Sequence, residues 1–177
     1  MRRRSISVIR VRTRPGQRSL GVLLSAGRAL PVAVGRSGIR ANKREGDRAT
    51  PEGDFAPVRL WWRADRYFRP RTFLPVRRIT PDLAWCEDPA DRRYNRPFRR
   101  STPESGDRLW RADHLYDFVI EIDHNVRPRI AGRGSAVFLH VARPDRLPTA
   151  GCIAMPARDL LRLAQGLSRK TRIRIQS

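Results

Sequence analysis

The sequence predicts a mainly β fold, a sandwich or barrel with long loops and one helix near the C-terminal end. Several short stretches alternate apolar and polar residues, one late stretch repeats apolar residues at helical spacing, and prolines interrupt the middle of the chain. Many strands with one clear helix favour a sandwich or barrel over an alternating parallel α/β sheet. A length of 177 residues suits one ordinary domain, so we expect a single domain over residues 1–177.

The N-terminal part is predicted to form strands. Residues 5–12 alternate Ile and Val with polar neighbours, with one break in the alternation. The stretches 20–24 and 30–34 are apolar and flank Ser25-Ala26-Gly27-Arg28, which is typical of a hairpin. A polar loop is expected over residues 35–53.

The middle of the chain is expected to be rich in loops. After a strand at 55–62, residues 63–113 contain Pro70, Pro75, Pro81, Pro89, Pro97 and Pro103. Proline interrupts helices and central strands because it lacks the backbone N–H, so we expect extended loops with short strands such as 74–79. β-rich runs return at 116–122 and 136–141.

One helix is predicted after Met155. Pro156 suits its first turn, and residues 166–168 are expected to end it. Its apolar residues recur at helical spacing: Leu160, Leu163, Ala164 and Leu167. A closing strand is expected at 170–175.

The charge balance is strongly basic. The chain has 38 Lys and Arg residues but only 17 Asp and Glu residues. The resulting net charge of +21 will attract phosphates, carboxylates or acidic polymers. Only Lys43 and Lys170 are lysines, and the longest basic run is Arg2-Arg3-Arg4. This spread favours an arginine-rich proteome over a selected DNA-binding patch. A basic nucleic-acid-binding module remains the alternative of another class, because residues 61–69 interleave aromatic and guanidinium groups; core or loop packing is the competing interpretation.

No stretch approaches the roughly 18 apolar residues of a membrane span, so an integral membrane protein is not expected. The stretch 20–24 is either a hairpin strand or part of a weak export signal cleaved near Ala26. Two cysteines are too few for a disulfide framework. His114 and His124 match no metal-ligand spacing with His140 and Cys152, so we expect no metal site.

The strongest chemical signal combines His140 with Cys152. His140 ends an apolar strand, Cys152 precedes the helix, and the polar loop 141–148 between them can fold back and bring imidazole and thiol together. A protonated imidazole that lowers the thiol pKa by roughly 2.5 units would raise the thiolate fraction at pH 7 about thirtyfold. Gly151 allows close backbone approach to a substrate, and its amide would hold an oxyanion.

Each of these residues also has a structural interpretation. Cys152 alone is compatible with an inert cysteine that packs as a small hydrophobe, and His140 with a structural histidine. Cys86 is a poor nucleophile, because the charges of Glu87 and Asp88 disfavour its thiolate.

Several segments resemble the L,D-transpeptidases with a YkuD-type catalytic domain. They read Thr-Pro-Glu-Gly-Asp-Phe at 50–55, Gly-Ser-Ala-Val-Phe-Leu-His at 134–140 and Thr-Ala-Gly-Cys-Ile-Ala-Met at 149–155. Trp-Cys-Glu-Asp-Pro at 85–89 and Tyr-Asn at 94–95 resemble a loop of the short alpha- and betaproteobacterial branch. The similarity runs from about residue 35 to the C-terminus and implies a β-rich fold.

The resemblance implies a reaction on peptidoglycan stem peptides. Cys152 would attack a stem carbonyl, form a thioester and pass the acyl group to an amine of another stem. His140 would be the base, oriented by the Val141 backbone carbonyl, and the Gly151 and Cys152 amides would form the oxyanion site. The family implies a periplasmic, carbapenem-sensitive enzyme that needs no cofactor. Because the basic residues are spread along the chain, we also expect no nucleic-acid partner.

The resemblance leaves the product and the recognition of substrate open. The short branch is associated with links between L-Ala at stem position 1 and diaminopimelate at position 3, whereas standard members join two diaminopimelates. Water could resolve the same thioester, which makes a carboxypeptidase or endopeptidase the close alternative.

Two positions depart from the family pattern. Many members have His and Arg where this chain has Ala150 and Ala154. We therefore expect other residues to recognise the stem peptide, and the expected substrate-binding set is Thr149, Arg143, Arg48, Arg96, Tyr94 and Asn95.

Overall fold

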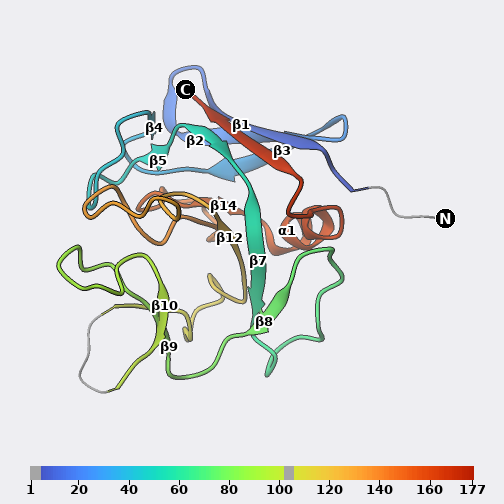
Figure 1. The fold of residues 1–177 in the computed structure, drawn as a ribbon. Coiled ribbons are helices and arrows are strands. Elements are labelled where there is room, and N and C mark those ends of the chain that lie inside the picture. The colour runs from blue at the N-terminus through green and yellow to red at the C-terminus, as the bar shows by residue number, and fades with distance from the viewer. Residues whose placement is uncertain (1–4, 102–105) are drawn as a thin grey trace.

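A computed structural model describes residues 5–101 and 106–177 of the chain, so the arginine run at 2–4 and Pro103 lie outside the described residues. The described part contains a ten-stranded sheet, a three-stranded sheet, a two-stranded sheet and the helix α1 (Ala157–Ala164) (Figure 1). The prediction of a mainly β fold with a helix after Cys152 is confirmed. Among the described residues, no helix is long and apolar enough to cross a membrane.

The large sheet is mixed. Parallel pairing joins β1 to β15, β13 to β14 and β7 to β8, and its other neighbours are antiparallel. Its strands, in spatial order, are β6 (Gly53–Phe55), β15 (Arg172–Gln176), β1 (Val8–Arg14), β2 (Gln17–Ser25), β3 (Arg28–Ala33), β14 (Ile153–Met155), β13 (Phe138–Val141), β12 (Phe118–Ile122), β7 (Pro57–Trp62) and β8 (Val76–Arg78).

The sheet folds over on itself around one main core. Only Ala56 separates β6 from β7, although these strands lie near opposite ends of the strand order. In Figure 1, β1, β2 and β3 form a layer above β14 and β12, and α1 lies at one end. Ile9 and Leu23 from the upper layer share a buried apolar cluster with Phe118 and Ile153 from the lower one. Each such fully buried side chain contributes about 1.5–3 kcal/mol.

The predicted N-terminal hairpin is present. Antiparallel β2 and β3 pair Ser25 with Arg28 across a two-residue turn. Ala26 and Gly27 have φ values of 46° and 76°. Positive φ at both central positions suits the twist of a two-residue hairpin, and glycine adopts it without steric cost. The stretch 20–24 therefore lies within a core strand.

The middle of the chain contains more strands than the sequence predicted. A small sheet forms in the order β10 (Pro97–Arg99), β9 (Leu83–Trp85) and β11 (Asp107–Arg108), and the strand expected at 74–79 is reduced to β8. Another short pair, β4 (Ile39–Arg40) and β5 (Thr50–Pro51), lies within the expected polar loop. Strands of two or three residues are too short to show an alternating pattern.

Candidate active site

His140 and Cys152 lie on neighbouring parallel strands. His140 is within β13, and Cys152 directly precedes β14. The register pairs Leu139 with Ile153, which places Cys152 opposite Phe138, two residues from His140. Because side chains alternate between the faces of a sheet, His140 and Cys152 are on the same face.

Two cavities meet at Cys152. One, of about 580 Å³, has a wall that includes Lys43, Arg48, Gly151 and the carboxylates of Glu45, Glu87 and Asp107. The other, of about 320 Å³, is lined by His140 together with Arg36, Arg111, Arg143 and Thr149. Cys152, Tyr116 and Ala150 line both. The carboxylate cavity and the arginine cavity, as we call them, thus give two approaches to one sulfur, and His140 faces the second.

The Cys152 thiol is buried among backbone groups. Its Sγ donates to the Ala136 carbonyl at 3.1 Å and accepts from the Phe138 N–H at 3.4 Å. Burial raises the pKa of the Cys152 thiol to about 12, although the Phe138 amide favours the thiolate. The resting group is therefore a neutral thiol.

The His140 imidazole is held by the backbone next to it. Its Nδ1 lies 2.9 Å from the Val141 carbonyl oxygen, so Nδ1–H donates and Nε2 is left as the basic atom. The ring meets the Tyr116 ring edge-on with centroids 5.2 Å apart. Burial lowers the pKa of His140 to about 4. The imidazole is therefore neutral at pH 7.

In the resting site, burial opposes the expected lowering of the thiol pKa by a protonated imidazole. Burial disfavours the charge on both groups, so a thiol and a neutral imidazole are the stable pair. This pair can still act on a substrate if His140 takes the thiol proton as the sulfur attacks. The arrangement suits general-base catalysis.

The neutral pair predicts a spectroscopic result. Because the pKa of Cys152 is about 12, this residue should contribute no thiolate absorbance near 240 nm between pH 7 and about pH 10. Replacing Cys152 by Ala is therefore expected to leave that absorbance unchanged over this range. Titration of the wild type, Cys152→Ala and Cys86→Ala proteins measures this. An absorbance step centred at or below pH 7 that disappears only in Cys152→Ala would show a resting ion pair instead.

The backbone before Cys152 requires glycine. Gly151 has a φ of 147°, and a Cβ there would lie 2.8 Å from the Ala49 carbonyl oxygen. The Gly151 N–H donates to Thr149 Oγ1 at 3.1 Å, and that hydroxyl donates to the Cys152 carbonyl at 2.6 Å. Contrary to expectation, the Gly151 amide is thus engaged internally rather than aimed at an oxyanion. Among the described residues, no carbonyl accepts the Cys152 N–H.

Thr149 and Thr50 brace the same turn. Thr149 lines the arginine cavity, but its hydroxyl bonds the backbone, so its main role is to position Cys152. Thr50, which is fully buried, accepts the Gly35 N–H at 2.8 Å and lies 3.5 Å from the Cys152 carbonyl oxygen. In the sequence, Thr50 stood out only as part of a resembling segment, without a role.

Tyr94 and Asn95 line neither of the two cavities at Cys152, contrary to the expectation that they bind substrate. Both are buried, and the Asn95 side chain accepts from the Trp85 indole at 2.9 Å and the Ala136 N–H at 3.2 Å. The Tyr94 hydroxyl donates to Glu45 and accepts the Gly134 N–H. Their polar atoms are satisfied internally, so they position the segment whose Ala136 carbonyl accepts the Cys152 thiol.

The three arginines expected to bind substrate are separated. Arg143 lines the arginine cavity and Arg48 lines the carboxylate cavity, so both lie at the sulfur. Arg96 lines a different cavity and is not part of this site. Sequence reasoning missed Arg36 and Arg111, which complete the arginine cavity.

Tyr116 stands between the two cavities and was also missed. Its hydroxyl donates to Asp107 at 2.8 Å, and the Arg111 guanidinium lies over its ring at 5.2 Å. Burial, followed by the charge of Asp107, raises the pKa of Tyr116 well above its usual value. The phenol therefore stays protonated beside His140.

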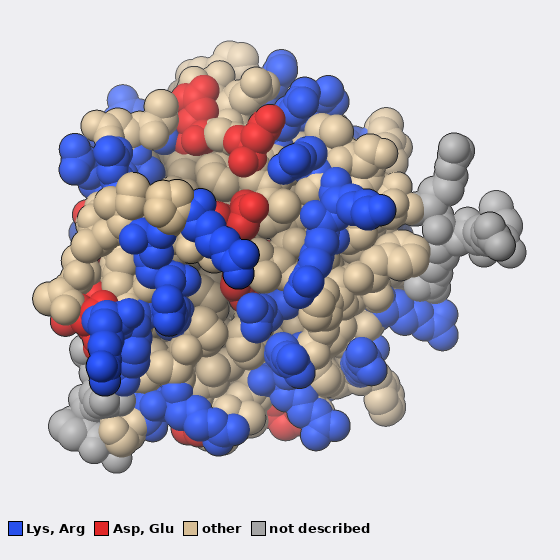
Figure 2. All heavy atoms as spheres, viewed as in Figure 1, with Lys and Arg blue, Asp and Glu red and all other residues tan. Residues whose placement is uncertain are grey.

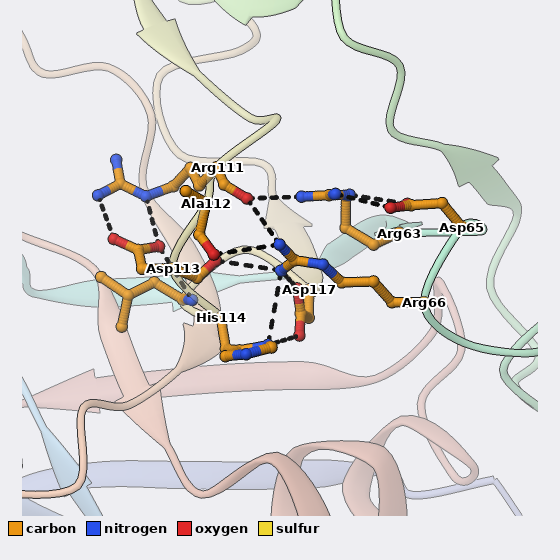
Figure 3. A network of polar contacts seen from close by, with 9 residues as sticks. Arg63, Asp65, Arg66, Arg111, Ala112, Asp113, His114 and Asp117 are labelled. Carbon is orange, nitrogen blue, oxygen red and sulfur yellow. Dashed lines mark hydrogen bonds and ion pairs between the residues drawn. The ribbon is translucent and has the colours of Figure 1, made fainter.

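A polar network holds the loop that carries Arg111 and Tyr116 (Figure 3). Arg63 donates to the Arg111 carbonyl at 2.6 Å, and Arg66 donates to the same carbonyl at 3.2 Å. Arg66 also pairs with the buried Asp117 at 2.6 Å, and His114 contacts the other oxygen of Asp117 at 2.7 Å. Arg63 and Arg66 lie about 50 positions from Arg111 and Asp117 in the chain, so no local pattern reveals these contacts.

The remaining sequence candidates lie elsewhere. Cys86 is buried in a separate small cavity, where burial is the main cause that raises its thiol pKa. His124 contacts the Arg133 carbonyl through Nε2. Trp61 and Trp62 are buried in the core, so these two rings serve packing rather than an exposed binding platform.

Two carboxylates of the carboxylate cavity, Glu87 and Asp107, have raised pKa values. Glu87 is exposed at the cavity wall, where desolvation by the surrounding atoms, together with the charges of Asp107 and Glu45, raises its pKa to about 7. Burial also raises the pKa of Asp107. The carboxylate cavity can therefore accept or release a proton near neutral pH, whereas the arginine cavity offers permanent positive charge.

Comparison with known proteins identifies the domain type. A family model described as YkuD, the L,D-transpeptidase catalytic domain, matches residues 13–175. No curated protein and no solved structure matches the chain. The matched span contains both cavities and both strands that carry the His140 and Cys152 pair.

Proposed function

Because this chain belongs to the YkuD family of L,D-transpeptidase catalytic domains, which are cysteine acyltransferases that act on peptidoglycan, we propose that Cys152 is its nucleophile and His140 its general base. One observation carries this assignment. The two side chains line the same cavity from neighbouring parallel strands, with the Nδ1 of His140 bonded to the Val141 carbonyl. Residues 1–177 are proposed to act as one catalytic domain.

Acylation begins with the neutral pair. Nε2 of His140 takes the thiol proton as Sγ attacks a carbonyl of the donor stem peptide, and the carbonyl oxygen becomes an oxyanion. The Cys152 N–H is the proposed oxyanion donor. The C–N bond then breaks, the leaving amine takes the proton from His140, and a thioester remains on Cys152.

Deacylation uses the same groups in reverse. The amine of an acceptor stem attacks the thioester carbonyl while His140 takes its proton. The C–S bond breaks, and the sulfur recovers that proton as a thiol. Water in place of the amine would give hydrolysis, which is the carboxypeptidase or endopeptidase outcome.

The charges of the two cavities suggest which stem occupies each. Arg36 and Arg143 suit the carboxylates of a donor stem, so they replace the arginine absent at Ala154, whereas Arg111 is already paired with Asp113 at 2.7 Å. Glu87 and Asp107 suit the ammonium group of an acceptor, and Glu87 has a pKa matched to accepting its proton. We therefore place the donor in the arginine cavity and the acceptor in the carboxylate cavity.

This placement predicts different effects for two substitutions. Arg143→Gln is expected to raise the KM for the donor by up to about tenfold, since it removes a charge-assisted contact at an exposed position. Glu87→Gln is expected to lower the ratio of crosslinking to hydrolysis by about tenfold with little effect on donor KM. Quantifying crosslinked and hydrolysed muropeptides measures both, with Arg158→Gln on α1 as the control. The reverse pattern would place the donor in the carboxylate cavity and the acceptor in the arginine cavity.

The product is proposed to be a link between L-Ala at position 1 and diaminopimelate at position 3. Support comes from Ala150 and Ala154, which agree with the branch that the sequence resembles. Incubation with purified peptidoglycan, followed by digestion and mass spectrometry, distinguishes this link from one between two diaminopimelates and from hydrolysis. Since this substrate lies in the periplasm, we propose that the enzyme acts there.

A further inference from the structure

A third cavity lies apart from Cys152 and is rich in arginine. Its volume is about 660 Å³, and β7, β10 and residues 123–129 contribute to its wall. The charged residues that line it are Arg59, Arg96, Arg127, Arg129, Arg169, Glu121 and Asp123. Figure 2 shows Lys and Arg side chains spread over the face on which β7 lies in front, with few acidic groups among them.

The acidic residues of this cavity are already engaged. Arg59 pairs with the buried Glu121 at 2.9 Å, and Glu121 also accepts from the Trp61 indole at 3.1 Å. Asp123 accepts the Ala56 N–H at 2.7 Å. The charges of Arg59 and Glu121 therefore cancel each other. Asp123 is the only remaining negative charge among the described residues that line the cavity.

The other four arginines of the cavity have no acidic partner among the described residues. No carboxylate or carbonyl in that part of the chain accepts from the guanidinium groups of Arg96, Arg127, Arg129 and Arg169. The Nε of Arg129 is buried and has no hydrogen-bond acceptor. Burial, together with the positive charge of Arg96, lowers the pKa of Arg129, so the two cations repel each other. Arg96, Arg127 and Arg169 are exposed to solvent, so the unsatisfied buried donor is the Arg129 Nε, and both this donor and the like charges around it favour a ligand that compensates them.

We propose that this cavity binds a ligand that carries two or more phosphoryl groups. Four guanidinium groups against one carboxylate leave a net charge of +3, which a single carboxylate or monoanion would not balance. Guanidinium groups donate two parallel hydrogen bonds to phosphate oxygens, and the volume is in the range of small-molecule sites. The ligand is a soluble diphosphate or a lipid headgroup with two phosphoryl groups.

Titration calorimetry with inorganic pyrophosphate at physiological salt tests the site. The wild type is expected to bind with a stoichiometry of one. Arg129→Gln combined with Arg169→Gln is expected to weaken binding about 100-fold, since removing each charge-assisted hydrogen bond costs about tenfold. The matched control is Arg77→Gln with Arg158→Gln, which removes the same charge from exposed arginines outside this cavity. Circular dichroism and thermal unfolding check that both variants fold.

Two results would overturn the proposal. One is the absence of saturable binding to the wild type, and the other is an equally weakened control double variant, which would indicate diffuse attraction to net charge. Sedimentation with phosphatidylcholine vesicles that contain cardiolipin, a lipid with two phosphoryl groups, then separates the sources. If the protein binds these vesicles, pyrophosphate displaces it and the Arg129/Arg169 double variant does not bind, the ligand is a lipid headgroup. If the protein binds pyrophosphate but not the vesicles, the ligand is soluble.

Discussion

Replacing Cys152 by Ala is expected to abolish crosslink formation, with a loss of at least about 10³-fold in rate. The thiol is the sulfur on which both cavities converge, and no other described cysteine lies at His140. Without Sγ no thioester can form, and the general base has no proton to take. Crosslinked muropeptides released from purified peptidoglycan measure the effect.

The matched control is Cys86→Ala, which should retain most of the activity because Cys86 is buried in a separate cavity. A carbapenem is expected to add its mass to the wild type and to Cys86→Ala but not to Cys152→Ala. Loss of activity in the Cys86 variant alone would reverse the assignment, and the absence of any adduct would argue against the thioester.

Replacing His140 by Gln is expected to lower the rate of acylation by about 10²–10⁴-fold, the usual contribution of a general base. Since the pKa of His140 is about 4, the wild-type rate of carbapenem acylation should fall only below about pH 5, where the imidazole becomes protonated. The variant should lose this acid limb. A rate that is unaffected by the substitution would remove His140 from the mechanism.

The same histidine predicts a change in folding stability with pH. Its pKa falls from the ordinary value of 6.5 to about 4 in the folded protein, so the unfolded state binds more protons between these values. Stability should therefore decrease as pH falls from about 6.5 to 4, by about 3 kcal/mol in total for this group. Urea unfolding of the wild type and His140→Gln across this range isolates the contribution. Identical pH slopes in the two proteins would contradict the burial of a neutral imidazole.

The parts of the fold that the sequence predicted are long and periodic. β1 alternates apolar and polar residues, β2 and β3 contain apolar stretches that flank a turn, and α1 repeats apolar residues at helical spacing. The strands of two or three residues, such as β9 and β14, carry no period of their own. Their pairing depends on tertiary contacts such as Leu139 with Ile153.

The candidate site was predictable where chemistry-bearing residues and a short connecting loop coincided, as for His140 and Cys152. The site was not predictable where its properties depend on which side chains are buried. The pKa values of both groups, and the internal hydrogen bonds of Asn95, depend on what packs around them. Tyr116 lies in a loop that Arg66, far away in the chain, braces through the Arg111 carbonyl and Asp117.

The reactive residues and the cavity-lining residues come from different parts of the β13–β14 unit. His140 and Cys152 are fixed by the register of the sheet, whereas Arg143, Leu147 and Ala150 come from the intervening segment and line the arginine cavity. Insertions or exchanges in this segment can change what the enzyme selects without altering how it reacts. New specificities can thus evolve, or be grafted by design, on an unchanged reactive pair.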